Sequence, residues 1–315
     1  MILVTGGTGY IGRNLVEKLL FLGYKVRLLS RNPEITKYMF PEADVVEGDV
    51  LKKSNLEIAV SGVSEVIHLA GLVSYTKPKD EIFHVNVDGT KNLIEVCVEL
   101  GVKRIIFSSS VSVYGPVEHV VTERTQPNPV NPYGESKLEA EKLILESGIP
   151  YVILRFAPVY GEGSPVWAKK LKLLERFPVP DTKNLTQLVN VFDAVHAFEI
   201  VLKKKDILGT YLIADKKPIK FVEFAEMLVR ELGKKPVKVP YWFAKFLSKV
   251  SGFGDYFEVL TMNRNYDITR AETELGFKPK ANMKEEIKKM VKWYRMTRME
   301  EAENILKRWA KKAGW

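Results

Sequence analysis

A tyrosine and a lysine near the middle of the chain have the types and spacing for proton transfer. Tyr133 and Lys137 lie four positions apart at the start of a predicted helix, so their side chains share one helix face. A positive charge near a phenol favours the phenolate and lowers a tyrosine pKa that is about 10 when unperturbed. A tyrosine tuned in this way is a general acid or base for an alcohol or a carbonyl. This spacing is common in any helix, so other motifs of the chain must show whether the two residues form a catalytic pair.

Hydroxyl groups collect at the end of a predicted strand that precedes this helix. The strand covers residues 104–110 and ends in the serines Ser108, Ser109 and Ser110. A serine at this strand end can hydrogen-bond the same oxygen that the tyrosine protonates or deprotonates. Serine, tyrosine and lysine together therefore predict acid–base chemistry on a C–O group.

The N-terminal residues predict a dinucleotide-binding turn. An apolar strand over residues 1–5 leads directly into a glycine-rich turn and then into a helix over residues 10–22. Glycines allow the tight turn and let backbone N–H groups approach a pyrophosphate at the positive end of the helix. The alternative is a glycine turn of purely structural use, but the order of strand, turn and helix favours the cofactor site. The expected cofactor contacts here are Gly6, Gly9, Tyr10, Ile11 and Gly12.

Predicted strands and helices alternate after this turn, which indicates a parallel sheet. Further buried strands cover residues 24–30, 45–50 and 66–71, each after a helical stretch. We therefore expect an α/β fold, namely a Rossmann doubly wound parallel sheet with helices on both faces and a smaller helix-rich C-terminal substrate lobe. Ligands of such sheets lie at the carboxyl ends of the strands. The cofactor contacts expected at these strand ends are Asp49, Val50, Leu69, Ala70 and Gly71.

Ser30 and Arg31 stand at the end of the second predicted strand, where NAD and NADP are discriminated. NAD-binding units carry an acidic residue here for the ribose hydroxyls, whereas an arginine accommodates the 2′-phosphate of NADP. The lack of an acid favours NADP as cofactor, with NAD as the other option. The alternative for Arg31 is a position at the tip of a surface loop without a role in binding.

After residue 164 the alternation of strands and helices gives way to a helix-rich pattern, which predicts that the chain has two parts. Residues 1–164 form the dinucleotide-binding domain, residues 188–214 return to it, and residues 165–315 mainly form the substrate lobe and the C-terminal helices. Helices are predicted over 167–177, 221–232, 241–250 and 286–294, and their aromatic stripes are typical of a core. Some aromatic side chains must still cover the nicotinamide end of the site, and the candidates are Tyr75, Trp167 and Phe192.

Composition limits the classes of protein that remain. The 315 residues carry a formal net charge of +9, but lysines alternate with glutamates on helix faces, which is typical of a solvated surface rather than of nucleic-acid binding. Richness in Lys and Glu is also typical of thermophilic proteins. Cys97 is the only cysteine and the four histidines lack metal-ligand spacing, so we expect no disulfide, no metal and a reducing cytoplasm. No apolar run reaches the roughly 18 residues of a membrane span, and no signal peptide is expected before an N-terminal strand.

Residues 299–315 form a basic amphipathic pattern. Met299, Ile305 and Trp309 fall on one helix face, with Lys307 and Lys311 beyond it. Such a helix can lie on an anionic membrane. Packing of this helix on its own lobe is the favoured interpretation, and weak association with a membrane surface is the alternative.

These segments together give the chain a resemblance to the extended short-chain dehydrogenase/reductase family, of the NAD-dependent epimerase/dehydratase type. The resemblance covers most of the chain, and its motifs are Asp49 and residues 5–12, 68–71, 86–90, 108–115, 133–137, 155–161 and 275–279. It implies that Ser110, Tyr133 and Lys137 are catalytic and that Lys137 also hydrogen-bonds the nicotinamide ribose. It further implies cofactor contacts at Ser108, Pro158 and Val159.

Three departures from the family pattern concern the substrate. Members that act on nucleotide sugars commonly carry asparagine at the position of Pro158 and arginine at that of Thr186, and neither residue here supplies the donors that a diphosphate needs. Arg264 is either a diphosphate contact or a structural surface arginine. Residues 26–31 and 69–75 are more similar to the branch of dihydroflavonol reductases and 3β-hydroxysteroid dehydrogenases, which handles small or lipophilic carbonyls.

The leading hypothesis is therefore an NAD(P)-dependent oxidoreductase that transfers hydride between nicotinamide and a small or hydrophobic alcohol or ketone. One alternative is a nucleotide-sugar 4-epimerase or dehydratase with tightly bound NAD. The other is a non-catalytic dinucleotide-binding sensor, against which the presence of serine, tyrosine and lysine argues.

The resemblance also implies a homodimer, in which the helix over residues 80–101 and the helix at Tyr133 pair with their mates. Ile82, Val85 and Ile94 form a second apolar strip on the first helix. One domain face covers only one side of such a helix, so we expect a second subunit to cover the other strip.

Overall fold

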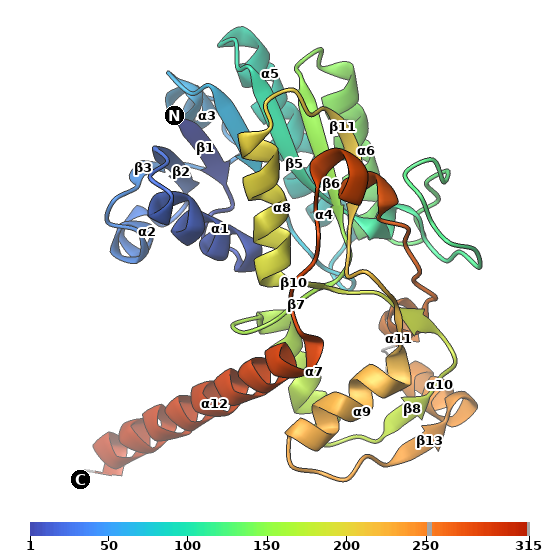
Figure 1. The fold of residues 1–315 in the computed structure, drawn as a ribbon. Coiled ribbons are helices and arrows are strands. Elements are labelled where there is room, and N and C mark those ends of the chain that lie inside the picture. Colours follow the sequence, from blue (N-terminus) through green and yellow to red (C-terminus); the bar gives the residue numbers. More distant parts are fainter. Residues whose placement is uncertain (251–253, 314–315) are drawn as a thin grey trace.

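The computed structural model describes residues 1–250 and 254–313, with the side chains of all these residues except 255, 256 and 300–313. A large sheet with helices on both faces forms the upper part in Figure 1, and a smaller lobe lies below it. The C-terminal helix extends to one side of this lobe.

Seven parallel strands form the central sheet, in the order β11-β6-β5-β4-β1-β2-β3. The order reverses between β1 and β4, and ligands of such sheets bind at this switch point. The predicted doubly wound α/β fold is confirmed. The strands are β1 (Ile2–Thr5), β2 (Val26–Ser30), β3 (Asp44–Glu47), β4 (Glu65–His68), β5 (Arg104–Ser110), β6 (Tyr151–Phe156) and β11 (Gly209–Ile213).

Helices cover both faces of the sheet, because successive strand residues point to opposite sides. Val4 of β1 belongs to the core beneath α1 (Tyr10–Phe21) and α8 (Val191–Lys203). Its neighbour Leu3 belongs to a separate core on the other face. That face is covered by α3 (Lys53–Val60), α5 (Gly89–Glu99) and α6 (Pro132–Glu146).

A π turn interrupts the helix predicted over residues 80–101. The segment consists of α4 (Lys79–Phe83), the π turn η1 (His84–Asp88) and α5. A π turn inserts an extra residue and so rotates the face that follows it. Ile82 and Ile94 are therefore both buried within one chain, at 0% and 8% exposure. Ile82 and Ile94 therefore need no second subunit to cover them, because α4 and α5 pack against α6, and α5 also packs against α3, whereas Val85 is only half-buried.

The lower lobe has its own apolar core. Trp167 of α7 (Pro165–Leu174), Phe224 of α9 (Phe221–Glu231) and Met290 of α12 (Met283–Ala313) meet there. The helix predicted over residues 286–294 is thus part of a longer helix that continues into the tail. The sequence also predicted that one face of the helix over residues 299–315 packs on this lobe. Most of the side chains of that face lie outside the described residues.

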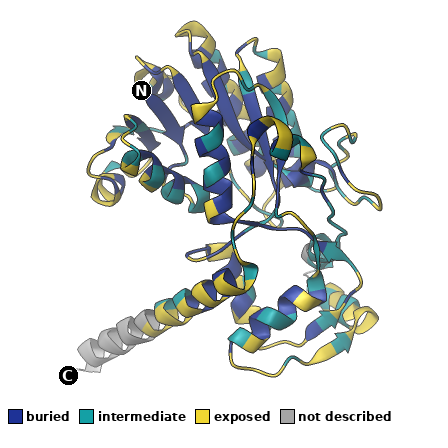
Figure 2. Cartoon of the chain, in the orientation of Figure 1, coloured by how far each residue is buried: buried dark blue, intermediate teal, exposed yellow. Residues whose placement is uncertain are grey.

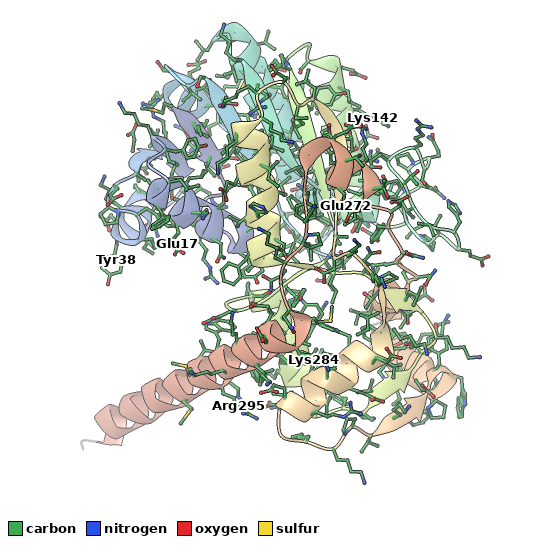
Figure 3. The ribbon with its side chains drawn as sticks, in the orientation of Figure 1. Glu17, Tyr38, Lys142, Glu272, Lys284 and Arg295 are labelled. Atoms are coloured by element: carbon green, nitrogen blue, oxygen red, sulfur yellow. The ribbon has the colours of Figure 1, made fainter. Side chains whose placement is uncertain are left out.

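The remaining elements are short. They are α2 (Pro33–Met39), α10 (Tyr241–Val250), α11 (Gly254–Thr261), η2 (Val111–Val113), η3 (Ala271–Leu275), β7 (Val159–Tyr160), β8 (Val179–Asp181), β9 (Leu185–Thr186), β10 (Val189–Asn190), β12 (Ile219–Lys220) and β13 (Lys238–Pro240). Labelled charged residues such as Glu17, Lys142 and Arg295 lie at the periphery (Figure 3). Among the described residues, no helix combines the length and the apolar character needed to cross a bilayer.

A buried ion pair fastens α6 to the sheet. Arg155 of β6 donates through Nε and Nη2 to the two carboxylate oxygens of Glu141, at 2.9 and 2.5 Å. The same carboxylate accepts a hydrogen bond from Ser109 of β5, and Arg155 also donates to the Tyr114 hydroxyl at 2.6 Å. Only 1% of the Glu141 side chain is exposed. A paired and fully hydrogen-bonded charge is tolerated in such a place, but a single charge is not.

We expect Glu141→Gln to lower the free energy of unfolding by about 3–5 kcal/mol, because it leaves the Arg155 guanidinium buried without a counter-ion. Glu139→Gln on the same helix is the matched control, since Glu139 pairs with Lys142 at the surface and such pairs contribute about 0–1 kcal/mol. Denaturant unfolding of both variants measures the difference. Equal stability of the two variants would contradict the anchoring role of Glu141.

Candidate active site

The glycine turn packs tightly against the end of β4. A Cβ on Gly12 would stand 2.1 Å from the carbonyl oxygen of Gly6, and a Cβ on Gly6 would stand 2.6 Å from the nitrogen of Ala70. Gly6 also has a φ of 71°, which a residue with a side chain rarely adopts. Gly9 is the N-cap of α1, and because it is a glycine it has no side chain that could cap the helix. The first N–H groups of α1 are therefore available to a pyrophosphate at the positive helix end, and the turn fits a dinucleotide.

A chain of hydrogen bonds through His68 connects this turn to the neighbouring strands. The N–H of Ala70 donates to the Thr5 hydroxyl at 3.2 Å, and that hydroxyl lies 2.7 Å from Nδ1 of His68. Nε2 of His68 lies 2.9 Å from the Thr90 hydroxyl, which donates to the carbonyl of Asn86 at 2.6 Å. Because Thr90 gives its proton to a carbonyl, it must accept from Nε2–H, so Thr5 donates to Nδ1. Burial lowers the His68 pKa to about 3, which keeps the ring neutral in this tautomer.

Asn86, in the π turn, connects the loop after β4 to the start of α6. Its Oδ1 accepts from the N–H of Leu72 at 2.6 Å, and its Nδ2 donates to the carbonyl of Leu72 at 3.1 Å. Nδ2 also donates to the Ser136 hydroxyl at 2.9 Å, and Ser136 donates to the carbonyl of Tyr133 at 2.8 Å. The strand end and the candidate catalytic helix are thereby held in one rigid arrangement.

Tyr133 lies buried at the first turn of α6. Asn131 caps this helix by accepting the N–H of Gly134 at 2.9 Å, which suits the preference of asparagine for the N-cap. Burial raises the pKa of Tyr133 well above its usual range and Tyr75 adds to this, while a hydrogen bond with Ser110 opposes it. The Tyr75 ring stands edge-on to Tyr133 with the centroids 5.8 Å apart, so the structure brings this predicted aromatic residue to the site.

Lys137 does not tune Tyr133 in the way that the sequence predicted. Its Nζ donates to the carbonyl of Ser108 at 2.9 Å and lies 4.7 Å from the centroid of the Phe107 ring. Burial lowers the Lys137 pKa to about 8, and Glu141 opposes this shift. The expectation of a lowered tyrosine pKa is wrong for this structure, because desolvation of the buried phenolate is the largest influence on Tyr133 and raises its pKa.

Ser110 ends β5 and faces the same space. Its Oγ accepts from the N–H of Ser112 at 3.1 Å and lies 3.1 Å from the Ser112 hydroxyl. Gly71 at the end of β4 is also close, since a Cβ there would stand 3.3 Å from Nζ of Lys137. The strand ends of β4 and β5 and the start of α6 thus bring Ser110, Tyr133, Lys137 and the glycine-lined cradle together.

The residues predicted to contact the cofactor at the ends of β2 and β3 differ in their hydrogen bonds and exposure. Ser30 is hydrogen-bonded to Thr36 at 2.6 Å, so its hydroxyl serves the local turn. Asp49 accepts from the N–H of Leu51 at 3.0 Å, and Val50 is buried. Arg31 is exposed, and no hydrogen bond or ion pair to another described residue holds its side chain.

Lys170, a residue that the sequence does not single out, lies on α7 of the lower lobe. Nζ of Lys170 lies 3.9 Å from the centroid of the Trp167 ring. Burial lowers the Lys170 pKa to about 7, and the charge of Arg264 lowers it further. Among the described residues, no carboxylate pairs with Lys170. The spacing of Trp167 and Lys170 on one helix face was the available signal, but it does not reveal that Arg264 approaches from a distant part of the chain.

Arg264 has the structural role considered for it, and its role as a diphosphate contact stays a prediction. Its guanidinium donates to the carbonyls of Val259 and Met262, which is a structural role. It also lines a small cavity beside the site, together with Ser112, Asn131 and Tyr266.

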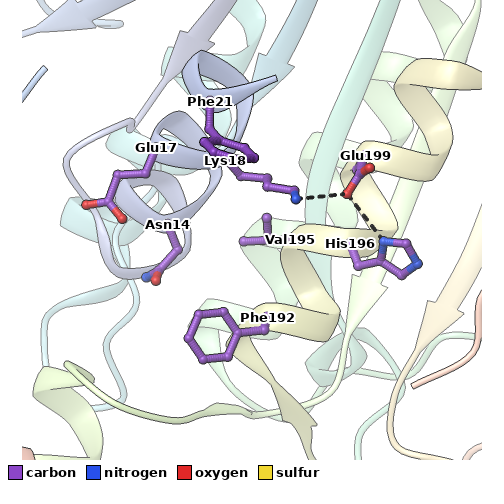
Figure 4. A pocket seen from close by; sticks show the side chains of 8 residues that line it. All are labelled: Asn14, Glu17, Lys18, Phe21, Phe192, Val195, His196 and Glu199. Atoms are coloured by element: carbon purple, nitrogen blue, oxygen red, sulfur yellow. Dashed lines mark hydrogen bonds and ion pairs between the residues drawn. The ribbon is translucent and has the colours of Figure 1, made fainter. Parts of the chain in front are cut away.

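Other predicted residues lie at the border of the site or outside it. Pro158 and Val159 are half-buried, and the carbonyl of Val159 accepts from Nε1 of Trp167 at 2.9 Å. Thr186 is buried in β9 of the lobe. Phe192 is not brought to Tyr133 and instead lines a groove between α1 and α8 (Figure 4).

Comparison with known proteins places the chain in a family. The model of the NAD dependent epimerase/dehydratase family matches residues 2–214, and the chain belongs to this family. The resemblance to extended short-chain dehydrogenases/reductases and the prediction of an enzyme are confirmed.

Relatives of two kinds are similar to the chain. A UDP-glucose 4-epimerase of Vibrio cholerae is 30% identical over 308 residues, which cover 91% of this chain and 93% of that protein. A 3beta-hydroxysteroid-dehydrogenase/decarboxylase (isoform 1) of Arabidopsis thaliana is 28% identical over 342 residues, covering 91% and 78%. The solved structure of MoeE5 in complex with UDP-glucuronic acid and NAD superposes with a TM-score of 0.78 at 28% identity, covering 94% of this chain and 99% of that one.

Proposed function

We propose that the chain is an NAD(P)-dependent oxidoreductase for a small or hydrophobic alcohol and ketone pair, with Ser110, Tyr133 and Lys137 as its catalytic residues. The observation that carries the proposal is the convergence of these three side chains on a glycine-lined cradle at the carboxyl edge of the sheet. When bound, the cofactor would accept or supply the hydride. The sterol dehydrogenase among the relatives supports a hydrophobic substrate.

The side chains of the site would transfer the proton, bind the substrate oxygen and hold the cofactor. Burial favours the protonated phenol, so Tyr133 is suited to donate its proton to a carbonyl oxygen during reduction. Ser110 would donate a second hydrogen bond to that oxygen. Lys137, held on the carbonyl of Ser108, places a positive charge beneath the site. The residues of the cradle would hold the dinucleotide, with Gly6, Gly9 and Gly12 close to its pyrophosphate.

Tyr133→Phe should remove nearly all turnover, by about 10²–10⁴-fold, and leave cofactor affinity within a few-fold. The change deletes the proton carrier and little of the nucleotide site. Steady-state kinetics with a panel of ketones and titration with the cofactor measure the two effects separately. Ser110→Ala should cost less, because one of two hydrogen bonds to the substrate oxygen remains. Retention of most activity by Tyr133→Phe would mean that another residue is the acid.

We propose NADP as the preferred cofactor, since Arg31 is exposed at the end of β2 and free to meet a 2′-phosphate. Arg31→Ala should weaken NADPH binding by about 1.5–3 kcal/mol, the range of a charge-assisted hydrogen bond, and leave NADH binding unchanged. Calorimetric titration of both cofactors checks this. A wild-type protein that binds NADH as tightly as NADPH, with no response to the substitution, would exclude the NADP assignment.

A nucleotide-sugar epimerase is the second candidate, and one feature of this chain favours it. Arg264 lines the cavity beside the site and its charge acts on Lys170 of the lobe, and no carboxylate compensates Lys170 within the described residues. Two such positive charges suit an anionic group on a substrate. The epimerase among the relatives and the nucleotide sugar in the MoeE5 complex support the same assignment.

Lys170→Met separates the two candidates. For the proposed reductase, we expect the KM for a neutral ketone to change less than about twofold, and NADPH to be exchangeable and consumed. For an epimerase, the KM for a UDP-sugar should rise by about tenfold or more, which corresponds to loss of one charged contact. Lys169→Met, at the exposed neighbouring residue, is the control in both assays. Tightly retained NAD⁺ in the purified protein without net turnover would decide for the epimerase.

We further propose that residues 1–164 and 188–214 bind the cofactor and that the rest of the chain shapes the substrate site. We also propose that the enzyme is a homodimer that forms through α4, α5 and α6. The support for the dimer is the family resemblance, since the buried strip at Ile82 and Ile94 no longer argues for it. Light scattering should give about twice the chain mass of 35.9 kDa. A fully active particle of the single-chain mass would refute the dimer.

A further inference from the structure

The segment that contains α10 has an unusual composition. Residues 232–254 include five lysines and no aspartate, glutamate, arginine or histidine. The helix in their midst, Tyr241–Val250, carries Tyr241, Trp242, Phe243, Phe246 and Leu247. Aromatic and aliphatic residues combined with lysine alone are typical of helices that lie on anionic membrane surfaces.

The orientation of α10 is the reverse of that expected for a helix of a soluble core. None of its residues is buried. Trp242, Phe246 and Val250 are 70%, 59% and 72% exposed, whereas Ala244, Lys245 and Ser248 are half-buried. The side of the helix with Ala244 and Ser248 therefore faces the protein, and Trp242, Phe246 and Val250 face away from it. Figure 2 shows α10 without a buried residue at the outer edge of the lobe.

Contacts with α11 hold α10 in this orientation. The ring of Tyr241 packs on Phe257 with the centroids 5.7 Å apart, and Lys245 pairs with Glu258 at 3.3 Å. Rotating the helix to hide Trp242 and Phe246 would break both contacts. The exposed face, defined by Trp242, Phe246 and Val250, is thus a fixed feature of the surface.

Lysine residues beside this face favour a negatively charged partner. Lys238 and Lys245 are paired with glutamates, but Lys235 and Lys249 are exposed and pair with no carboxylate among the described residues. Two copies of a face that is bordered by Lys235 and Lys249 would bring like charges together and repel each other. A negatively charged surface would attract it, and lysine stems can lie along an apolar layer while their ammonium groups reach phosphates.

We propose that the exposed face of α10 docks the enzyme on the surface of an anionic lipid membrane. Trp242, Phe246 and Val250 insert at the level of the lipid headgroups, and Lys235 and Lys249 contact lipid phosphates. The face is formed by one helix, and its aromatic and lysine side chains match the boundary between the apolar layer and the phosphates of a lipid surface. Docking leaves the sheet and its cofactor site in water.

Sedimentation of the full chain with vesicles tests the proposal. The wild-type protein should bind vesicles of phosphatidylcholine with phosphatidylglycerol, and bind vesicles of phosphatidylcholine alone more weakly. Trp242→Ser with Phe246→Ser should reduce binding to the mixed vesicles by at least about tenfold, because two apolar insertions are lost. Lys235→Gln with Lys249→Gln should reduce it too and make it less sensitive to salt.

A matched control carries Phe21→Ser and Ile58→Ser, since these side chains are 84% and 61% exposed on other helices. It should bind as the wild type does, and thermal unfolding checks that each variant is folded. Failure of the wild type to sediment with either vesicle would overturn the proposal. Unchanged binding by the α10 variant would also overturn it, as would loss of binding only on Trp309→Ser in the tail. A change of oligomeric state in the α10 variant without vesicle binding would assign the face to a second copy instead.

Discussion

The buried pair of Glu141 and Arg155 is the contact on which the arrangement of the candidate site depends. It joins α6 to β6, and through Ser109 it also reaches β5. Glu141 lies one helical turn after Lys137, and Ser109 adjoins Ser110. One carboxylate therefore fixes the helix that carries Tyr133 and the strand that carries the serine. Its position in the core makes this geometry rigid, because any displacement would separate two charges in a medium that solvates neither.

A second network holds the opposite wall of the site. The neutral His68 ring connects β1 to the π turn, and Asn86 of that turn binds both the loop after β4 and the start of α6. The glycine turn lies against the same loop, since Gly6 leaves no room for a side chain beside Ala70. The cofactor cradle and the proton donor are thus positioned by one continuous set of contacts. This preorganisation is what acid–base catalysis on a bound substrate requires.

The features that could be predicted from the sequence are those that depend on local pattern. The glycine turn, the alternation of strands and helices, and the shared face of Tyr133 and Lys137 follow from spacing along the chain. The features that could not be predicted depend on which distant residues meet. The π turn in η1 changed the faces of a helix that was expected to be continuous, and it buried Ile94 within the chain. The direction of the Tyr133 pKa depends on how much water the fold removes, and the effect of the Arg264 charge on Lys170 depends on two residues that are 94 positions apart in the chain.

The central claim is that a dinucleotide binds on the glycine turn with its reactive end at Tyr133. A crystal structure of the protein with NADPH or NADH tests this most directly. We expect the pyrophosphate at the first N–H groups of α1, the nicotinamide ribose at Nζ of Lys137, and the nicotinamide ring on the same side as the hydroxyl groups of Tyr133 and Ser110. A dinucleotide bound away from α1, or one whose nicotinamide points away from Tyr133, would contradict it.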